Sequence, residues 1–203
     1  MATPGPRRGL LQASAAAASA ATLASLDVAR FAHAQGSGYI RVGMIGSGGR
    51  CTGAAEQALN TGQDVKLVAL CDVFEERVQA KLKYLTGAKP AQVEVPADRA
   101  FTGFDGYKRV IECSDVVLIA CASKFHPFYA RAALEAGKHV FVEKPHAIDA
   151  AGCRALESAC ALAKEKRRCL VSGLHSRCTP GCREAIRRVH DGAIGEIVAI
   201  EEN

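Results

Sequence analysis

From residue 39 onward, short apolar runs alternate with segments whose apolar residues recur at helical spacing. The apolar runs predict strands at Tyr39–Ile45, Val65–Cys71, Asp115–Ala120, His139–Glu143 and Cys169–Ser172. The other patterned segments predict helices at about Gly49–Asn60, Phe74–Leu85, Gly106–Glu112, Pro127–Ala136, Asp149–Lys166 and Thr179–Asp191. This alternation is typical of βαβ units, so we expect an α/β fold built on a doubly wound parallel sheet with helices on both faces.

One internal segment shows neither pattern. Lys89–Phe101 contains Pro90 and Pro96, and proline is excluded from the middle of a sheet because it cannot donate a ladder hydrogen bond. We therefore predict a loop here, around at most one short strand.

The first 34 residues have a different composition from the rest. Arg7 and Arg8 are followed by an Ala-rich, weakly apolar stretch that extends to Leu26, and Ala32-His33-Ala34 supplies a small-x-small cleavage pattern. An Ala-rich amphipathic helix or a disordered tail is the alternative, but the order of charge, apolar run and cleavage site favours a signal peptide. The arginine pair predicts twin-arginine export to the periplasm or an equivalent compartment. No later apolar run has the roughly 18 to 20 residues that a membrane span needs, so we expect no membrane contact after cleavage.

Charge and cysteine content exclude several classes of protein. The formal net charge is +5, of which residues 1–34 carry +2, from three arginines and one aspartate, so the remainder carries +3. That small, scattered excess predicts no nucleic-acid partner. The nine cysteines are odd in number and form no regular framework, which argues against a disulfide scaffold. Cys178 and Cys182 are spaced as metal ligands on a helix, but zinc needs two more ligands, and we predict no metal site.

The first candidate chemistry lies where the first predicted strand meets the first helix. The turn is glycine-rich and consists of Gly46, Ser47, Gly48, Gly49 and Arg50. Gly46 allows a tight turn, and Gly48 lets the backbone approach a pyrophosphate whose charge the helix N-terminus stabilises. The third position of this dinucleotide-binding fingerprint is Cys51 instead of Gly or Ala, which alters how closely helix and strand pack.

An acid at the end of the second predicted strand strengthens this interpretation. Asp72 follows the run that ends at Cys71, and a carboxylate there accepts the ribose hydroxyls of the adenosine and repels a 2′-phosphate. The alternative is an ordinary cap for the helix that begins near Phe74. Together the elements predict a Rossmann-type domain that binds NAD, with NADP as the less favoured cofactor.

Two further phrases carry a family resemblance. Residues 132–145 read AALEAGKHVFVEKP, which places Glu-Lys-Pro at the end of a predicted strand, and residues 190–200 read HDGAIGEIVAI. With the glycine turn in register, the chain from Tyr39 to Asn203 resembles the family of glucose–fructose oxidoreductase, inositol dehydrogenase and the MocA proteins. The resemblance implies a dinucleotide-binding domain at 38–173. It also implies that 174–203 is the start of an incomplete α/β substrate domain, with a strand at Gly195–Glu202.

The resemblance also implies roles for individual residues. Lys144 would be catalytic and would also contact the cofactor, hydrogen-bonding the reacting oxygen near the nicotinamide, where an ammonium stabilises a developing alkoxide. Glu143 would contact the cofactor ribose and orient the lysine; an ion pair between the two side chains is disfavoured because successive strand residues point to opposite faces. Further cofactor contacts are implied for Ala120, His126 and Arg177.

Two of these assignments depart from the family pattern. Ala122-Ser123-Lys124 stands where the family has prolines, so a helix-start histidine without a functional role remains an equal alternative for His126. Cys178 replaces an aromatic residue that is common beside the arginine matched by Arg177.

The leading functional hypothesis is an oxidoreductase that moves a hydride between a sugar or polyol hydroxyl and nicotinamide. A redox-neutral, NAD-dependent glycosidase of the same fold is the first alternative. A truncated, non-catalytic nucleotide-binding module is the second. The expected partner is a small sugar-like molecule, and a homo-oligomer is expected only for a full-length form.

Overall fold

The computed structural model of this protein describes residues 38–201. The predicted signal peptide at residues 1–34 lies outside the described residues. The sheet lies almost wholly in the compact unit that begins at Arg41.

A six-stranded sheet in the order β3-β2-β1-β4-β5-β6 forms the centre of the domain. Its strands are β1 Ile40–Ile45, β2 Val65–Asp72, β3 Ala100–Thr102, β4 Val116–Ile119, β5 His139–Val142 and β6 Leu170–Ser172. The helices are α3 Gly49–Leu59, α4 Glu75–Ala88, α5 Gly106–Cys113, α6 His126–Glu135, α7 Ala150–Glu165, α8 His175–Cys178 and α9 Pro180–His190. Two short 3₁₀ turns, η1 Ala97–Arg99 and η2 Ser123–Phe125, precede β3 and α6. The predicted doubly wound α/β fold is confirmed.

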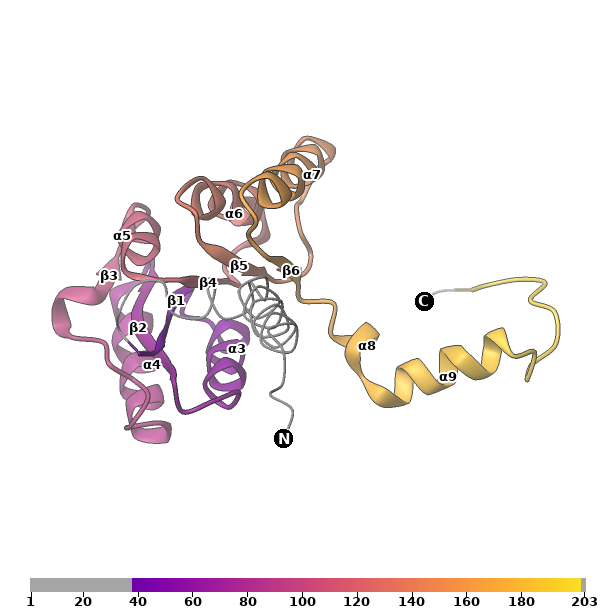
Figure 1. Ribbon diagram of the computed structural model, residues 1–203, viewed down its shortest axis with the longest axis horizontal. Helices are drawn as coiled ribbons and strands as arrows, with labels where there is room; N and C mark the ends of the chain where they lie inside the picture. Colours follow the sequence, from indigo (N-terminus) through magenta and orange to yellow (C-terminus); the bar gives the residue numbers. More distant parts are fainter. Residues whose placement is uncertain (1–37, 202–203) are drawn as a thin grey trace, which may run out of the picture. The chain divides into compact units, whose positions relative to one another are not determined.

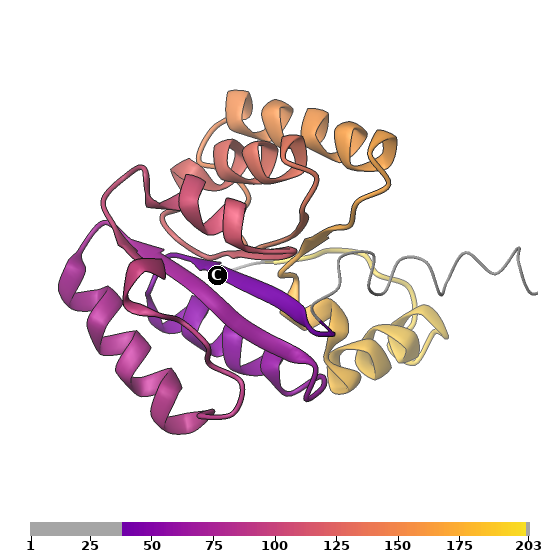
Figure 2. The same ribbon diagram turned by 60° about the vertical axis from the view of Figure 1, so that its left-hand side comes forward.

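The helices cover both faces of the sheet (Figure 1). In Figures 1 and 2, α3 and α4 lie on one face, while α5, α6 and α7 lie on the other. The pairs β1–β4, β2–β3, β4–β5 and β5–β6 are parallel. The chain therefore reverses direction of winding between β1 and β4, and such a switch point is where open α/β sheets bind ligands.

The strands are apolar on both faces because helices bury both. Met44 in β1, Leu67 and Leu70 in β2, and Val117 and Ile119 in β4 are completely or almost completely buried. Continuous apolar runs of this kind are what a sheet covered on both sides requires. This explains why the runs in the sequence predicted these strands well.

The proline-containing loop holds the one short strand that the sequence allowed. β3 occupies Ala100–Thr102 at the edge of the sheet and pairs in parallel with β2. An isolated bridge between Leu67 and Val93 ties the earlier part of the loop to β2.

The prediction of a strand at Gly195–Glu202 is wrong for residues 195–201, which are the part of it that the structure describes. Residues 195–201 form no strand, and Ile197, Val198 and Ile200 are exposed. An apolar run becomes a strand only when a neighbour pairs its backbone groups, and no other segment among residues 38–201 pairs with this one. None of the helices described within that range has the length and apolar character needed to cross a bilayer.

Candidate cofactor site

The glycine turn after β1 has a geometry that only glycine satisfies at its first position. Gly46 has φ +96°, and a Cβ added there would lie 2.9 Å from Cα of Cys121 at the end of β4. Its N–H donates to the carbonyl oxygen of Cys71 at the end of β2. Gly46 thus brings together the ends of three neighbouring strands, as predicted for the tight turn.

Gly48 and Gly49 are glycines for a different reason. A Cβ at either position would meet no atom within 4 Å. Gly48 is the N-cap of α3, and no side chain caps this helix end. The first N–H groups of an α-helix have no intrahelical partner and carry the positive end of its dipole. The first backbone N–H groups of α3 are therefore accessible to an anion, because no side chain caps them and the space beside Gly48 and Gly49 is open.

Asp72 joins the glycine turn to the end of β2. Its Oδ2 accepts a 2.7 Å hydrogen bond from the Ser47 N–H, and its Oδ1 accepts a 3.2 Å bond from the Phe74 N–H. The cap residue of α4 is Phe74 instead of Asp72, so Asp72 caps the turn before the helix. Each carboxylate oxygen can accept further hydrogen bonds, which leaves Asp72 able to receive ribose hydroxyls.

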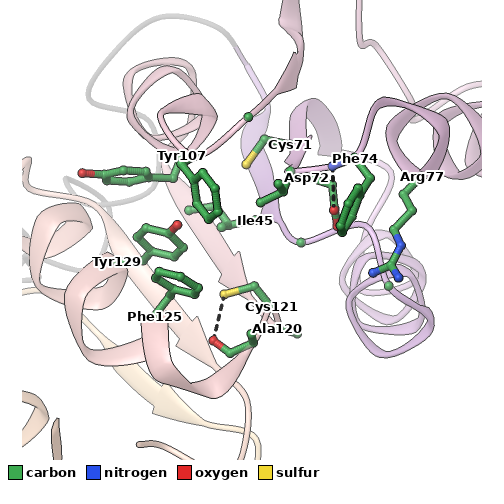
Figure 3. Close-up of a pocket in the computed structure, with 16 residues that line it drawn as sticks. Ile45, Cys71, Asp72, Phe74, Arg77, Tyr107, Ala120, Cys121, Phe125 and Tyr129 are labelled. Atoms are coloured by element: carbon green, nitrogen blue, oxygen red, sulfur yellow. Dashed lines mark hydrogen bonds between the residues drawn. The ribbon is translucent and has the colours of Figure 1, made fainter.

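A cavity of about 210 Å³ opens between the strand ends (Figure 3). Its lining includes Gly46, Asp72 and Ala120, which follow or end β1, β2 and β4, and Gly48 at the start of α3. Aromatic side chains form one wall: Tyr107 and Tyr129 stack with ring centroids 4.3 Å apart, and Phe125 and Tyr129 stack at 5.5 Å. A flat apolar wall of this kind suits a planar heteroaromatic ring.

Several of these wall residues were not predicted from the sequence. Phe104, Tyr107, Phe125 and Tyr129 come from α5, α6 and the loops before them, and Arg77 reaches the cavity from α4, where its guanidinium lies 5.0 Å from the Phe74 ring centre. The one feature of the sequence that could have indicated these residues is their position shortly after predicted strands. Which of the loop residues converge depends on the tertiary fold.

Three thiols surround the base of the glycine turn. Cys51, at the third position of the fingerprint, is completely buried, with Sγ 3.6 Å from the Ile45 carbonyl oxygen. Burial raises its pKa well above the ordinary value. Burial likewise raises the pKa of Cys71 and of Cys121 to about 12. These thiols are therefore neutral packing groups near neutral pH, and Cys51 fits where glycine or alanine is usual.

The Glu-Lys-Pro segment follows β5 at the same edge of the sheet. Glu143 is nearly buried, its Oε1 accepts a 2.6 Å hydrogen bond from Nε of Arg50, and its Oε2 accepts from the Lys144 N–H. The ion pair thus forms with Arg50 of α3 and leaves the Lys144 side chain exposed. The Lys144–Pro145 peptide bond is cis.

Two histidines hold the chain just beyond Lys144. The His126 ring is buried, with Nδ1 2.9 Å from the Pro145 carbonyl oxygen and Nε2 3.1 Å from that of Cys121. His146 Nε2 lies 2.5 Å from Oγ of Ser172 at the end of β6. His126 therefore holds the backbone of the Lys144 segment and does not line the cavity. Sequence reasoning did not single out His146.

The predicted site residues thus divide into three groups. Gly46, Gly48, Asp72 and Ala120 line the cavity, while Arg50, Glu143 and Lys144 lie at the end of β5 next to the first turn of α3. Arg177 lies exposed in α8, and no hydrogen bond or ion pair among the described residues joins its side chain to the others.

A dinucleotide fits this arrangement. The cavity over β1, β2 and β4 suits an adenosine, the uncapped start of α3 suits a diphosphate, and Lys144 beyond β5 lies on the side left for the other half of the molecule. Ligands of open α/β sheets occupy this edge for the same reasons.

Comparison with known proteins agrees with the geometry. Residues 40–174 match the model of an oxidoreductase family with an NAD-binding Rossmann fold, GFO_IDH_MocA. An inositol 2-dehydrogenase from Salmonella paratyphi B is 33% identical over 164 residues, which are 79% of this chain and 43% of that protein. Glycosyl hydrolase family 109 protein 3 from Phocaeicola vulgatus is 31% identical over 170 residues, which are 80% of this chain and 28% of that protein.

A solved structure extends the likeness to a ligand-bound relative. Scyllo-inositol dehydrogenase from Lactobacillus casei, with NAD(H) and scyllo-inositol bound, aligns with a TM-score of 0.59 and 28% identity, over 78% of this chain and 43% of that one. The chain thus spans less than half the length of each of these relatives.

Proposed function

Because the chain belongs to the oxidoreductase family with the NAD-binding Rossmann fold, we propose that its domain binds NAD and serves hydride transfer between nicotinamide and a sugar or polyol hydroxyl. The observation that carries this proposal is the position of Lys144 at the same sheet edge as the glycine turn and the aromatic cavity. The relatives named as inositol dehydrogenases support a polyol substrate.

Each group of residues has a task in this function. The aromatic wall holds the adenine, Asp72 accepts the ribose hydroxyls, and the N–H groups at the start of α3 bind the diphosphate. Bound nicotinamide supplies hydride acceptance and donation at its C4 atom. The Lys144 ammonium would donate a hydrogen bond to the substrate oxygen. In the direction of reduction it would stabilise the negative charge that grows on the carbonyl oxygen as hydride arrives at carbon, and in the direction of oxidation it would stabilise the alkoxide from which hydride departs. The contacts of Glu143, His126 and His146 keep the backbone on both sides of Lys144 in place.

Substitution of Lys144 tests the proposal. In a form of the protein that carries a complete substrate-binding region, Lys144→Ala should lower kcat by about 10²–10³, because one preorganised stabiliser of transition-state charge is lost. NAD affinity, measured by calorimetry, should change little. Lys124→Ala, an exposed lysine at the same sheet edge, is the matched control. Full activity of the Lys144 variant would refute the role of the lysine.

A redox-neutral glycosidase is the second candidate, favoured by the 31% identity to a family 109 glycosyl hydrolase. The same residues would bind NAD, but a substrate carbon would be oxidised only transiently to allow elimination of the aglycone. The two functions differ in their products. Release of a chromogenic aglycone from glycosides without accumulation of NADH would identify the glycosidase, whereas NADH formation from free polyols would identify the dehydrogenase.

We further propose that the protein is exported by the twin-arginine route. Arg7-Arg8 and the Ala-rich run before Ala32-His33-Ala34 support this. A protein exported in this way crosses the membrane folded, and we expect this one to cross with its cofactor already bound. Replacing both arginines by lysine should therefore retain the precursor in the cytoplasm, as cell fractionation and immunoblotting would reveal. Export of the double variant at the wild-type level would rule out this route.

A further inference from the structure

We propose that Arg50 is a positioning residue that neutralises the buried carboxylate of Glu143, so that a diphosphate can bind at the first turn of α3. The inference rests on the proposed binding of NAD. It gives Arg50 a task different from direct contact with the cofactor, which the glycine turn alone predicted.

The carboxylate of Glu143 is confined from several sides. Its side chain is only 4% exposed, whereas that of Arg50 is 44% exposed. One oxygen accepts from Nε of Arg50 at 2.6 Å and the other accepts from the Lys144 N–H at 2.9 Å. Gly173, after β6, leaves the necessary room, because a Cβ there would lie 2.6 Å from the carboxylate. Glu143 thus has little freedom to turn toward solvent.

This confinement places a negative charge next to an anion site. Arg50 belongs to the first turn of α3, and side chains in an α-helix tilt toward its N-terminus. The Glu143 carboxylate, 2.6 Å from Nε of Arg50, is therefore on the side of the helix start, where the first N–H groups can bind a diphosphate. Charges this close interact strongly where water is partly excluded. Without Arg50, the carboxylate would repel the diphosphate.

Two other roles for Arg50 make different predictions. If the guanidinium bound the diphosphate directly, its loss would weaken binding whether or not Glu143 carried a charge. If the pair were only a structural tie between α3 and β5, its loss would weaken the binding of every ligand in the cavity. If Arg50 neutralises Glu143, as we propose, its loss should weaken binding only when Glu143 is negatively charged and the ligand is an anion.

A double-mutant cycle on the 203-residue chain separates these roles. NAD affinity is measured by calorimetry for wild type, Arg50→Gln, Glu143→Gln and the double variant. We expect Arg50→Gln to weaken NAD at least about tenfold, and the double variant to lie within about threefold of Glu143→Gln. Arg50→Lys, which keeps the charge, should stay within a few-fold of wild type. The cycle Arg131→Gln with Glu135→Gln, an exposed arginine–glutamate pair on α6, is the control and should leave the affinity unchanged.

Adenosine, which carries no diphosphate, serves as the second probe. It should bind wild type and Arg50→Gln equally. Three outcomes would each overturn the inference: the same loss of NAD affinity from Arg50→Gln with and without the Glu143→Gln substitution, an unchanged affinity in Arg50→Gln, or a parallel loss of adenosine binding. Failure of the wild type itself to bind NAD would instead overturn the proposed function on which the inference rests.

Discussion

Asp72 shows how one carboxylate can serve the fold and the ligand together. It accepts backbone N–H groups from Ser47 and Phe74, and so connects the glycine turn to the start of α4. These bonds fix the position of its oxygens at the cavity edge before any ligand arrives. Asp72 is thus not the N-cap of α4, which is Phe74, but its contacts with the backbone are compatible with a role in ligand binding. Arg77 also lines this cavity and provides a positive charge there.

These two charges predict the choice between NAD and NADP. Asp72→Ala should weaken NAD by about tenfold or more, since charge-assisted hydrogen bonds to the ribose are lost, while NADP binding stays the same or improves. Arg77→Ala should weaken NADP and leave NAD nearly unchanged, because only the 2′-phosphate needs the guanidinium. Calorimetry with both cofactors measures each effect. Asp72→Asn, which keeps an oxygen for the Ser47 N–H, tests the charge alone; unchanged affinities throughout would contradict the assignment.

At the scale of elements, the sequence pattern predicted what depends on local periodicity and burial. The strands could be predicted from apolar runs because helices bury both faces of the sheet. The turn could be predicted because its positive φ at position 46 requires a glycine, which the sequence shows directly. The Arg50–Glu143 pair joins positions 93 residues apart, and nothing in the local sequence reports such a contact. The aromatic wall was missed for the same reason.

The strand expected at Gly195–Glu202 illustrates the opposite error. Its apolar residues predicted a strand, but pairing depends on a neighbour that a local pattern cannot reveal. Three of them, Ile197, Val198 and Ile200, are exposed instead.

The glycine turn yields a prediction that separates folding from binding. Gly46→Ala should destabilise the protein by about 1–3 kcal/mol, because alanine is strained at positive φ and its Cβ would press on Cys121. Gly48→Ala should change the free energy of unfolding by less than about 0.5 kcal/mol, since its φ is −85° and the space around it is open. The same substitution should weaken NAD, because the methyl group occupies the space where the diphosphate approaches. Denaturant unfolding measures the stability of both variants, and calorimetry measures their NAD affinity. Equal loss of stability in the two variants would contradict the assignment of Gly46 to folding and Gly48 to binding.

At the scale of the whole molecule, cofactor binding and catalysis make different demands on the chain. The residues that surround the cavity and hold Lys144 all lie between β1 and the end of β6. A dinucleotide site is therefore contained within one domain. Among the described residues, α8, α9 and residues 191–201 contain no buried side chain and form no comparable wall for a substrate.

We therefore expect the 203-residue chain to bind NAD but to turn substrate over slowly or not at all. Lys144 retains its local electrostatic effect, but holding the substrate beside the nicotinamide accounts for several kcal/mol of barrier lowering, about 7–11 in well-oriented reactions. The exposed Ile194, Ile197, Val198 and Ile200 form an apolar segment that favours self-association. The test is to purify the chain, confirm NAD binding by calorimetry, and screen sugars and polyols for NADH formation, with light scattering to detect aggregates. Saturable turnover at rates typical of dehydrogenases, on the order of 1–10³ per second, would overturn this expectation and place the substrate site within the nucleotide-binding domain itself.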